Sequence, residues 1–231
     1  MINSKISKTL ILLYFLVSIV EIIGIVLEQR ILLLIFKPLI IPILGLTYIN
    51  SVDKINKWYL LVLVLSFLGD VFLLFSGSNY FILGLGSFLL AHIVYIKIIK
   101  KDLKLFTLKK IIVAAFPFVL IFIFLISILY QNLGGMLAPV IIYGLTISVF
   151  GAISFYNYLE KKSNVSLLLA LGAVIFIASD AMIALQKFHE PKSLYPVAIM
   201  ITYVLAQYLI FKYMIGQIPQ KFKANSQQSI T

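Results

Sequence analysis

Long runs of apolar residues separated by short polar segments dominate this chain. A helix that crosses about 30 Å of hydrocarbon needs about 20 such residues, and eight runs approach that length. They predict membrane-spanning helices near residues 7–27, 31–50, 57–76, 80–99, 109–130, 137–159, 165–186 and 194–215. We therefore expect an all-α fold, a polytopic bundle of eight transmembrane helices. Residues 1–216 would form this single domain, and the polar residues 217–231 a flexible cytoplasmic tail.

The composition indicates a membrane protein. Of the 231 residues, 62% are hydrophobic and 12% are charged, and the mean hydropathy is +1.11, whereas soluble domains contain about 45–50% apolar residues. The net charge of +11 would favour a nucleic-acid partner in a soluble protein, but the basic residues lie in the short connections between runs, so no nucleic-acid partner is expected. Because the chain has no cysteine, it has no disulfide, thiolate nucleophile or Cys-based zinc site.

The distribution of basic residues predicts the orientation in the membrane. If the amino terminus is cytoplasmic, fifteen of the nineteen basic residues lie on that side, and Lys37 lies inside a run. The opposite side carries only Arg30, Lys187 and Lys192. Short cytoplasmic loops of membrane proteins are enriched in Lys and Arg. We therefore expect both termini in the cytoplasm and a location in the bacterial cytoplasmic membrane.

Ionisable residues inside four of the runs mark a candidate site. Glu21, Lys37, Asp70 and Asp180 each lie about six residues, or roughly 9 Å, from the non-cytoplasmic end of their runs. A lone charge within a membrane helix costs about 2.5–3.5 kcal/mol on insertion scales, so we expect these groups to share a cavity and compensate one another. His92, about 18 Å from the same face, would line the floor of that cavity.

A weak internal repeat relates runs three and seven. Each run carries an aspartate after a small residue, and the run that follows each carries polar side chains, His92 and Tyr95 in the first case and Tyr203 and Gln207 in the second. The repeat is compatible with two parallel four-helix halves that meet at a polar interface. Chance similarity between apolar sequences is the alternative.

Each candidate residue also has a purely structural interpretation. Asp70 and Asp180 can act as packing contacts that hydrogen-bond across helices. Glu21 and Lys37 can form a structural ion pair, or reach towards the lipid headgroups. His92 can be a hydrogen-bonded interior histidine. The residues alone leave these alternatives open.

Five short motifs in these runs share their order and spacing with one known group of proteins. They are Phe36-Lys37-Pro38-Leu39, Phe67-Leu68-Gly69-Asp70, Gly84-Leu85 through Phe88 to Ala91-His92 and Tyr95, Gly172 through Phe176 to Ser179-Asp180, and Thr202-Tyr203 with Ala206-Gln207. On these motifs the chain resembles the YhhN-like family of integral membrane proteins, whose characterised members are lysoplasmalogenases. The resemblance covers most of the chain but gives no support to Glu21.

The resemblance implies hydrolysis of the vinyl-ether bond of a lysoplasmalogen. The products would be a fatty aldehyde and a glycerophospho-alcohol, either glycerophosphoethanolamine or glycerophosphocholine. Protonation of the β-carbon leaves an oxocarbenium ion that water attacks, and two carboxyl groups suit these steps as acid and base. Asp70 and Asp180 would carry these two roles, in an order that the sequence does not assign.

The other motif residues would assist the two aspartates. His92 is the third catalytic candidate, as a residue that positions water or relays protons. Substrate-binding roles fall to Lys37, which can bind the lipid phosphate, and to Tyr95, Tyr203 and Gln207. The expected partners are a lysophospholipid substrate and membrane lipids. No cofactor and no metal is implied.

Other functional classes fit the residues less well. A zinc hydrolase would need several histidines near the metal, and His92 is the only histidine within a run. The Gly69-Asp70 pair suggests an intramembrane aspartyl protease, but the second aspartate lacks the partner motif of that class. The main alternative is a proton-coupled transporter or lipid-binding membrane protein that uses the same Asp and His residues. A transporter would leave the covalent structure of its substrate unchanged.

Overall fold

The computed structural model describes residues 4–101, 103 and 107–217 of the chain. Almost all of the predicted tail, from residue 218 onward, therefore lies outside the described residues. Within the described residues the chain is all-helical, with eight α-helices and one 3₁₀ turn and no strand. These elements are α1 (Ser4–Val26), α2 (Arg30–Ser51), α3 (Lys57–Leu73), α4 (Ser78–Lys101), α5 (Leu108–Leu133), η1 (Gly134–Met136), α6 (Leu137–Lys161), α7 (Asn164–Phe188) and α8 (Tyr195–Gly216).

The helices are apolar enough for a multi-pass integral membrane protein. In the described residues, six helical segments have the length and hydropathy to cross a membrane, and one of them, Leu108–Lys161, contains α5, η1 and α6 together. Helix α3 has 17 residues, which is the lower end of the range of about 17–25 residues for a spanning helix. Eight separate membrane crossings therefore stay a prediction.

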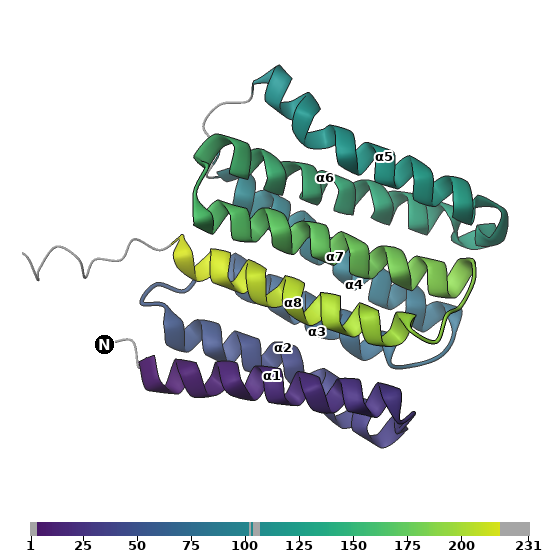
Figure 1. Ribbon diagram of the computed structural model, residues 1–231, viewed down its shortest axis with the longest axis horizontal. Coiled ribbons are helices and arrows are strands. Elements are labelled where there is room, and N and C mark those ends of the chain that lie inside the picture. The colour runs from purple at the N-terminus through teal and green to yellow at the C-terminus, as the bar shows by residue number, and fades with distance from the viewer. Residues whose placement is uncertain (1–3, 102, 104–106, 218–231) are drawn as a thin grey trace, which may run out of the picture.

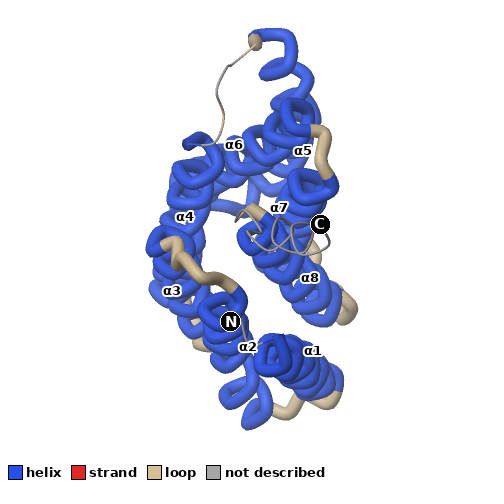
Figure 2. The backbone as a smooth tube through the Cα atoms, turned by 90° about the vertical axis from the view of Figure 1, so that its left-hand side faces the viewer, coloured by secondary structure: helices blue, strands red, loops and turns tan. Residues whose placement is uncertain are grey.

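Consecutive helices run antiparallel (Figure 1), and consecutive helices pack closely against each other except for α4 and α5. The start of α1 and the end of α8 consequently lie at the same end of the bundle (Figure 1). Seen approximately along the helices, α2, α3 and α4 form one side and α7 and α8 the other (Figure 2). Helix α6 contacts both α4 and α7, and α8 contacts α1 and α2, so the two sides enclose one core. Helix α5 lies outside this arrangement, against α6 and α7.

The boundaries of α3 and α7 change the depth of the two aspartates. Helix α3 ends at Leu73, before the predicted end at residue 76. The chain then reverses through Gly77, whose φ of 119° is a backbone angle that glycine adopts more readily than other residues do. Helix α7 continues to Phe188, beyond the predicted end at residue 186. Asp70 therefore lies in the last turn of α3, whereas Asp180 lies more than two turns before the end of α7. The equal spacing of these residues from their helix ends, which the sequence predicted, is wrong.

Helices approach closely beside Asp70 and, on α7, about two turns before Asp180. A Cβ atom on Gly69 would lie 2.5 Å from the ring of Phe88, so α3 approaches α4 at the residue next to Asp70. A Cβ atom on Gly172 would lie 2.9 Å from Ile210, so α7 approaches α8 in the same way. Small residues permit such contacts between membrane helices, where packing rather than water exclusion holds the helices together.

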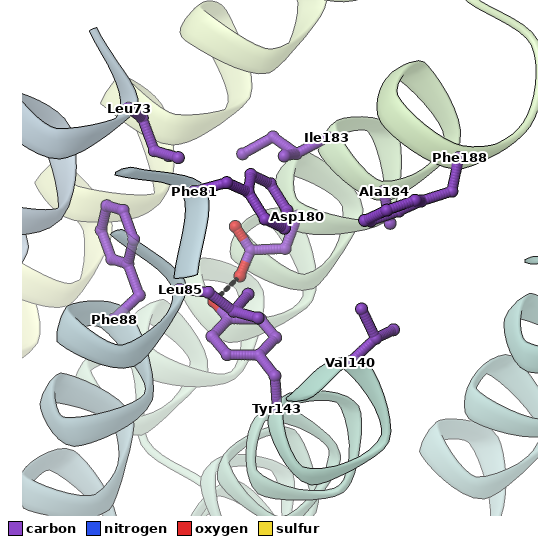
Figure 3. A pocket seen from close by; sticks show the side chains of 10 residues that line it. All are labelled: Leu73, Phe81, Leu85, Phe88, Val140, Tyr143, Asp180, Ile183, Ala184 and Phe188. Carbon is purple, nitrogen blue, oxygen red and sulfur yellow. Dashed lines mark hydrogen bonds between the residues drawn. The ribbon is translucent and has the colours of Figure 1, made fainter. Parts of the chain in front are cut away.

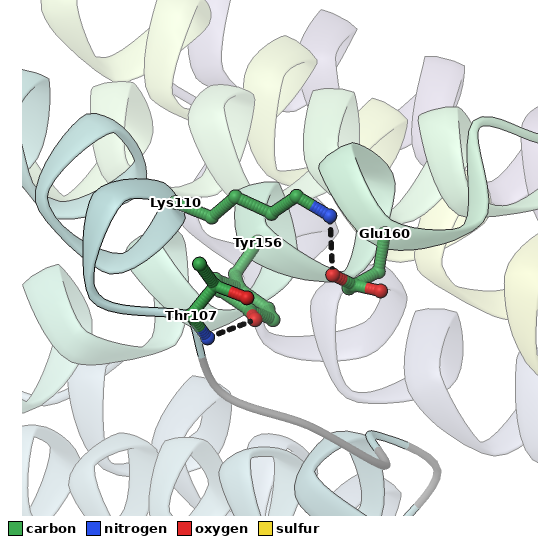
Figure 4. Close-up of polar contacts among 4 residues, drawn as sticks. All are labelled: Thr107, Lys110, Tyr156 and Glu160. Atoms are coloured by element: carbon green, nitrogen blue, oxygen red, sulfur yellow. Dashed lines mark hydrogen bonds and ion pairs between the residues drawn. The ribbon is translucent and has the colours of Figure 1, made fainter.

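Polar contacts at the end of the bundle near the chain termini attach the start of α5 to α6 (Figure 4). The backbone N–H of Thr107 donates to the hydroxyl of Tyr156 at 3.0 Å, and the ammonium of Lys110 forms an ion pair with Glu160 at 2.5 Å. Both side chains of the ion pair are partly exposed, so the pair contributes little to stability. Apolar side chains cover much of the outer face of α5, as expected for a helix in contact with lipid.

Candidate active site

Asp70 is buried at the end of α3 and is held by a residue of α8. The hydroxyl of Tyr203 donates to Asp70 Oδ2 at 2.6 Å. Gln207 Nε2 in turn donates to the Tyr203 hydroxyl at 3.3 Å. The hydroxyl of Tyr95, on α4, donates to Gln207 Oε1 at 3.5 Å. Four residues that the sequence nominated separately thus form one hydrogen-bonded chain across three helices.

The geometry of α8 explains the middle of this chain. Tyr203 and Gln207 are four residues apart, so they lie on one face of the helix, about one turn from each other. Both are buried, with 5% and 0% of their surface exposed. Neither is among the lining residues of the cavities described below. Tyr203 therefore holds Asp70 through a hydrogen bond, and the direct contact with substrate that the sequence predicted for Tyr203 and Gln207 stays a prediction.

Asp180 has a different partner on a different helix. The hydroxyl of Tyr143, on α6, donates to Asp180 Oδ2 (Figure 3). The two side chains are the polar members of a cavity of about 50 Å³ that is otherwise apolar. Its other lining residues come from α3, α4, α6 and α7 and include Leu73, Phe81 and Ile183. Asp180 is thus the aspartate that a ligand in this cavity would meet.

Tyr143 is the main site residue that the sequence analysis missed. It is a hydroxyl group near the start of α6, and that start lies at the same end of the bundle as the end of α7. Sequence alone does not show that α6 and α7 are neighbours with these two side chains facing each other. The contact of Tyr143 also departs from the predicted internal repeat. Asp70 on α3 bonds to α8, so the repeat would pair Asp180 on α7 with α4, but Asp180 bonds to α6.

The ionisable groups lie within electrostatic range of one another. Asp70 and Asp180 are close enough for their charges to interact, and Lys37 interacts in the same way with Asp70 and with Glu21. The proposed ion pair between Glu21 and Lys37 is not formed, since the close ion pairs found among the described residues involve other side chains. In that part of the chain, no group of three or more His, Asp or Glu side chains could hold a metal ion.

A larger, more polar cavity adjoins the Asp180 cavity. It has a volume of about 460 Å³ and lies towards the end of the bundle where α1 ends and α8 begins. Four polar side chains line it: Glu21 on α1, Lys37 on α2, and Gln186 and Lys187 on α7. The two cavities have three lining residues in common, Leu73, Phe81 and Ile183. The two cavities are therefore direct neighbours.

His92 does not line either cavity, so the predicted position on a cavity floor is wrong. Aromatic rings surround the imidazole, with ring centroids at 4.9 Å for Phe176, 5.0 Å for Phe150 and 5.9 Å for Tyr143. Neither ring nitrogen has a hydrogen-bond partner among the described residues, although the carbonyl of Phe88 lies nearby. These aromatic side chains separate His92 from the cavities, and its nearest link to the site is the edge-on contact with Tyr143.

This chain is similar in sequence to known proteins. It is 30% identical over 156 residues to lysoplasmalogenase TMEM86A of Bos taurus, which covers 64% of this chain and 61% of the bovine protein. The match thus spans about three fifths of the length of that relative. No solved structure matches this chain. The family model described as the YhhN family matches residues 32–214, a region that contains Lys37, Asp70 and Asp180. This chain therefore belongs to the YhhN family.

Proposed function

We propose that this protein hydrolyses the vinyl-ether bond of lysoplasmalogens to a fatty aldehyde and glycerophosphoethanolamine or glycerophosphocholine. One observation carries the proposal: Asp180, held by a hydrogen bond from Tyr143, lines an apolar cavity, and a second buried carboxyl group, Asp70, lies one turn before Leu73, which lines the same cavity. The bovine relative, whose printed name is lysoplasmalogenase, supports the same class of reaction.

In the first step, Asp180 acts as the acid because it is the aspartate that lines the apolar cavity. Its carboxylic acid protonates the β-carbon of the vinyl ether, and the electron pair of the double bond forms the new C–H bond. The positive charge is then shared by the α-carbon and the ether oxygen. Asp70 is not among the residues that line the cavity, so its carboxylate stabilises this oxocarbenium ion through its charge and takes the proton of the attacking water through one intervening water molecule.

In the second step, the resulting hemiacetal divides into the two products. The Asp180 carboxylate takes the proton of the hemiacetal hydroxyl as the aldehyde C=O forms. Protonated Asp70 gives its proton to the departing glycerol oxygen as the C–O bond breaks. Both carboxyl groups thus return to their initial protonation states, and the net reaction consumes one water.

Three side chains position the two aspartates in this mechanism. Tyr143 and Tyr203 each donate a hydrogen bond to one oxygen of an aspartate and leave the other oxygen for the reaction. His92 packs edge-on against Tyr143 at 5.9 Å, so we assign it a positioning role rather than direct contact with substrate. Lys37, at the neighbouring polar cavity, would bind the lipid phosphate.

The transporter alternative is favoured by one observation. The hydrogen-bonded chain from Tyr95 through Gln207 and Tyr203 to Asp70 resembles the relays that carry protons in membrane transporters. A transporter releases its substrate intact, whereas a hydrolase does not. The two functions are therefore separated by the covalent structure of the product.

The proposed reaction is tested by mass spectrometry of purified protein incubated with lysoplasmalogens in H₂¹⁸O and in D₂O. We expect one deuterium on the carbon next to the aldehyde carbonyl, ¹⁸O in the freshly formed aldehyde and none in the glycerophospho-alcohol. The saturated 1-O-alkyl lysolipid is the matched control and should stay intact, because it has no double bond to protonate. Recovery of intact lysoplasmalogen, or ¹⁸O in the alcohol, would contradict the proposal.

We also propose that all eight helices cross the membrane with both termini in the cytoplasm. Because the chain has no cysteine, single cysteines can be placed at Ser78 and Lys101, the two ends of α4, without background labelling. A membrane-impermeant thiol reagent added to oriented vesicles should label these two positions from opposite sides. Labelling of both positions from one side would refute the topology.

A further inference from the structure

The polar cavity of about 460 Å³ contains a buried carboxylate that the proposed hydrolysis does not use. Glu21 lines this cavity from α1 and is only 1% exposed. Its Oε2 atom is buried and has no hydrogen-bond partner among the described residues. A buried acceptor without a partner is costly, and more so when it carries charge. A ligand that brings a cationic donor into the cavity would remove this cost.

The same cavity also presents two ammonium groups. Lys37 reaches it from α2 and Lys187 from α7, and neither is part of the close ion pairs found in the described part of the chain. The ammonium of Lys187 lies 4.4 Å from the ring centroid of Phe81. Phe81 lines both the polar cavity and the Asp180 cavity. Lys187 therefore lies beside a residue that lines both cavities.

Two cations and one carboxylate around one cavity match the headgroup of a zwitterionic lysophospholipid. The phosphate can accept hydrogen bonds from the two lysines, and an ammonium can donate to the carboxylate. A primary ammonium has N–H donors for Glu21, whereas a quaternary ammonium such as choline has none. The charged groups thus favour a phosphoethanolamine headgroup over a phosphocholine headgroup.

We propose that this cavity is the headgroup subsite, in which Lys37 and Lys187 bind the phosphate and Glu21 binds the ethanolamine ammonium. The identity of the lipid rests on the proposed function, and Lys187 and Glu21 are assigned from the cavity alone. The glycerol segment would cross the residues common to both cavities, Leu73, Phe81 and Ile183. The bond to be cleaved would then lie beside Asp180.

Binding is measured in detergent by calorimetry with 1-O-alkyl lysolipids, which have no vinyl ether to cleave. Replacing Glu21 with glutamine keeps the shape and removes the charge. Glu21→Gln should weaken binding of the alkyl lysophosphoethanolamine about 10- to 100-fold, the usual effect of losing a charge-assisted hydrogen bond. It should leave the corresponding alkyl glycerophosphate, which has no ammonium, unchanged or more tightly bound. Lys187→Gln should weaken the binding of both ligands.

Matched controls come from the same end of the protein. Glu28 and Lys192 are exposed and do not line the cavity, so Glu28→Gln and Lys192→Gln should bind both ligands like the wild type. If Glu21→Gln does not fold, the wild type still tests the proposal, because it should bind the ethanolamine lipid more tightly than its choline analogue. Glycerophosphoethanolamine and inorganic phosphate, as competitors, distinguish a headgroup subsite from a plain anion site.

Three results would overturn the proposal. The first is an equal loss of affinity for both ligands in Glu21→Gln. The second is an unchanged affinity of that variant for the ethanolamine lipid. The third is competition by inorganic phosphate that is as strong as competition by glycerophosphoethanolamine. None of these ligands is hydrolysed, so binding is measured separately from catalysis. Release of aldehyde from lysoplasmalogens together with any of these results would refute the headgroup subsite and leave the proposed hydrolysis standing.

Discussion

Replacing Asp180 with asparagine is expected to lower the rate of vinyl-ether cleavage by about 10²–10⁴-fold, the usual range for loss of a general acid. Asparagine has nearly the same shape and can still accept the hydrogen bond that Tyr143 donates to this position. It has no acidic proton to give to the β-carbon, so the slow step loses its catalyst while the fold is preserved. The measurement is aldehyde release per folded molecule at saturating lysoplasmalogen.

Tyr143→Phe is the matched control for Asp180→Asn. It removes the hydrogen bond to Asp180 Oδ2 but leaves the acidic group in the apolar cavity. The rate should therefore fall less than in Asp180→Asn, and binding of the uncleavable 1-O-alkyl lysolipid should persist in both variants. Turnover near the wild-type value in folded Asp180→Asn would remove Asp180 from the mechanism.

Replacing Asp70 with asparagine is the second change with a large expected effect. If the carboxylate stabilises the oxocarbenium ion and takes a proton from water, turnover per folded molecule should again fall by about 10²–10⁴-fold. The packing interpretation predicts a different result, because Asp70 also joins α3 to α8 through Tyr203. On that interpretation Asp70→Asn would lower the stability in detergent and keep the activity of the molecules that stay folded.

Two measurements on the same samples separate these interpretations of Asp70. The folded fraction is followed by thermal unfolding monitored by size-exclusion chromatography, and turnover is divided by that fraction. Asp53→Asn, at an exposed position between α2 and α3, is the control for loss of a carboxylate and should change neither quantity. Tyr203→Phe breaks the same helix contact without removing the charge, so it should lower stability more than activity per folded molecule.

The sequence by itself determined the fold class and most of the candidate residues. Lipid offers no partners to backbone N–H and C=O groups, so apolar runs of this length must form helices, and their number and approximate limits follow from hydropathy. The cost of a charge at membrane depth singled out Asp70 and Asp180. The weak internal repeat and the YhhN motifs both pointed to Tyr203 and Gln207, which the structure places in one hydrogen-bonded chain with Asp70.

Only the tertiary structure decided which of these residues meet. It paired Asp180 with Tyr143, enclosed His92 in aromatic rings, and placed Glu21 and Lys187 at one cavity with Lys37. The physical reason is that hydropathy and helical periodicity give each residue a depth and a face within its own helix. They do not give the neighbours of that helix, because these depend on side-chain packing between segments far apart in the sequence.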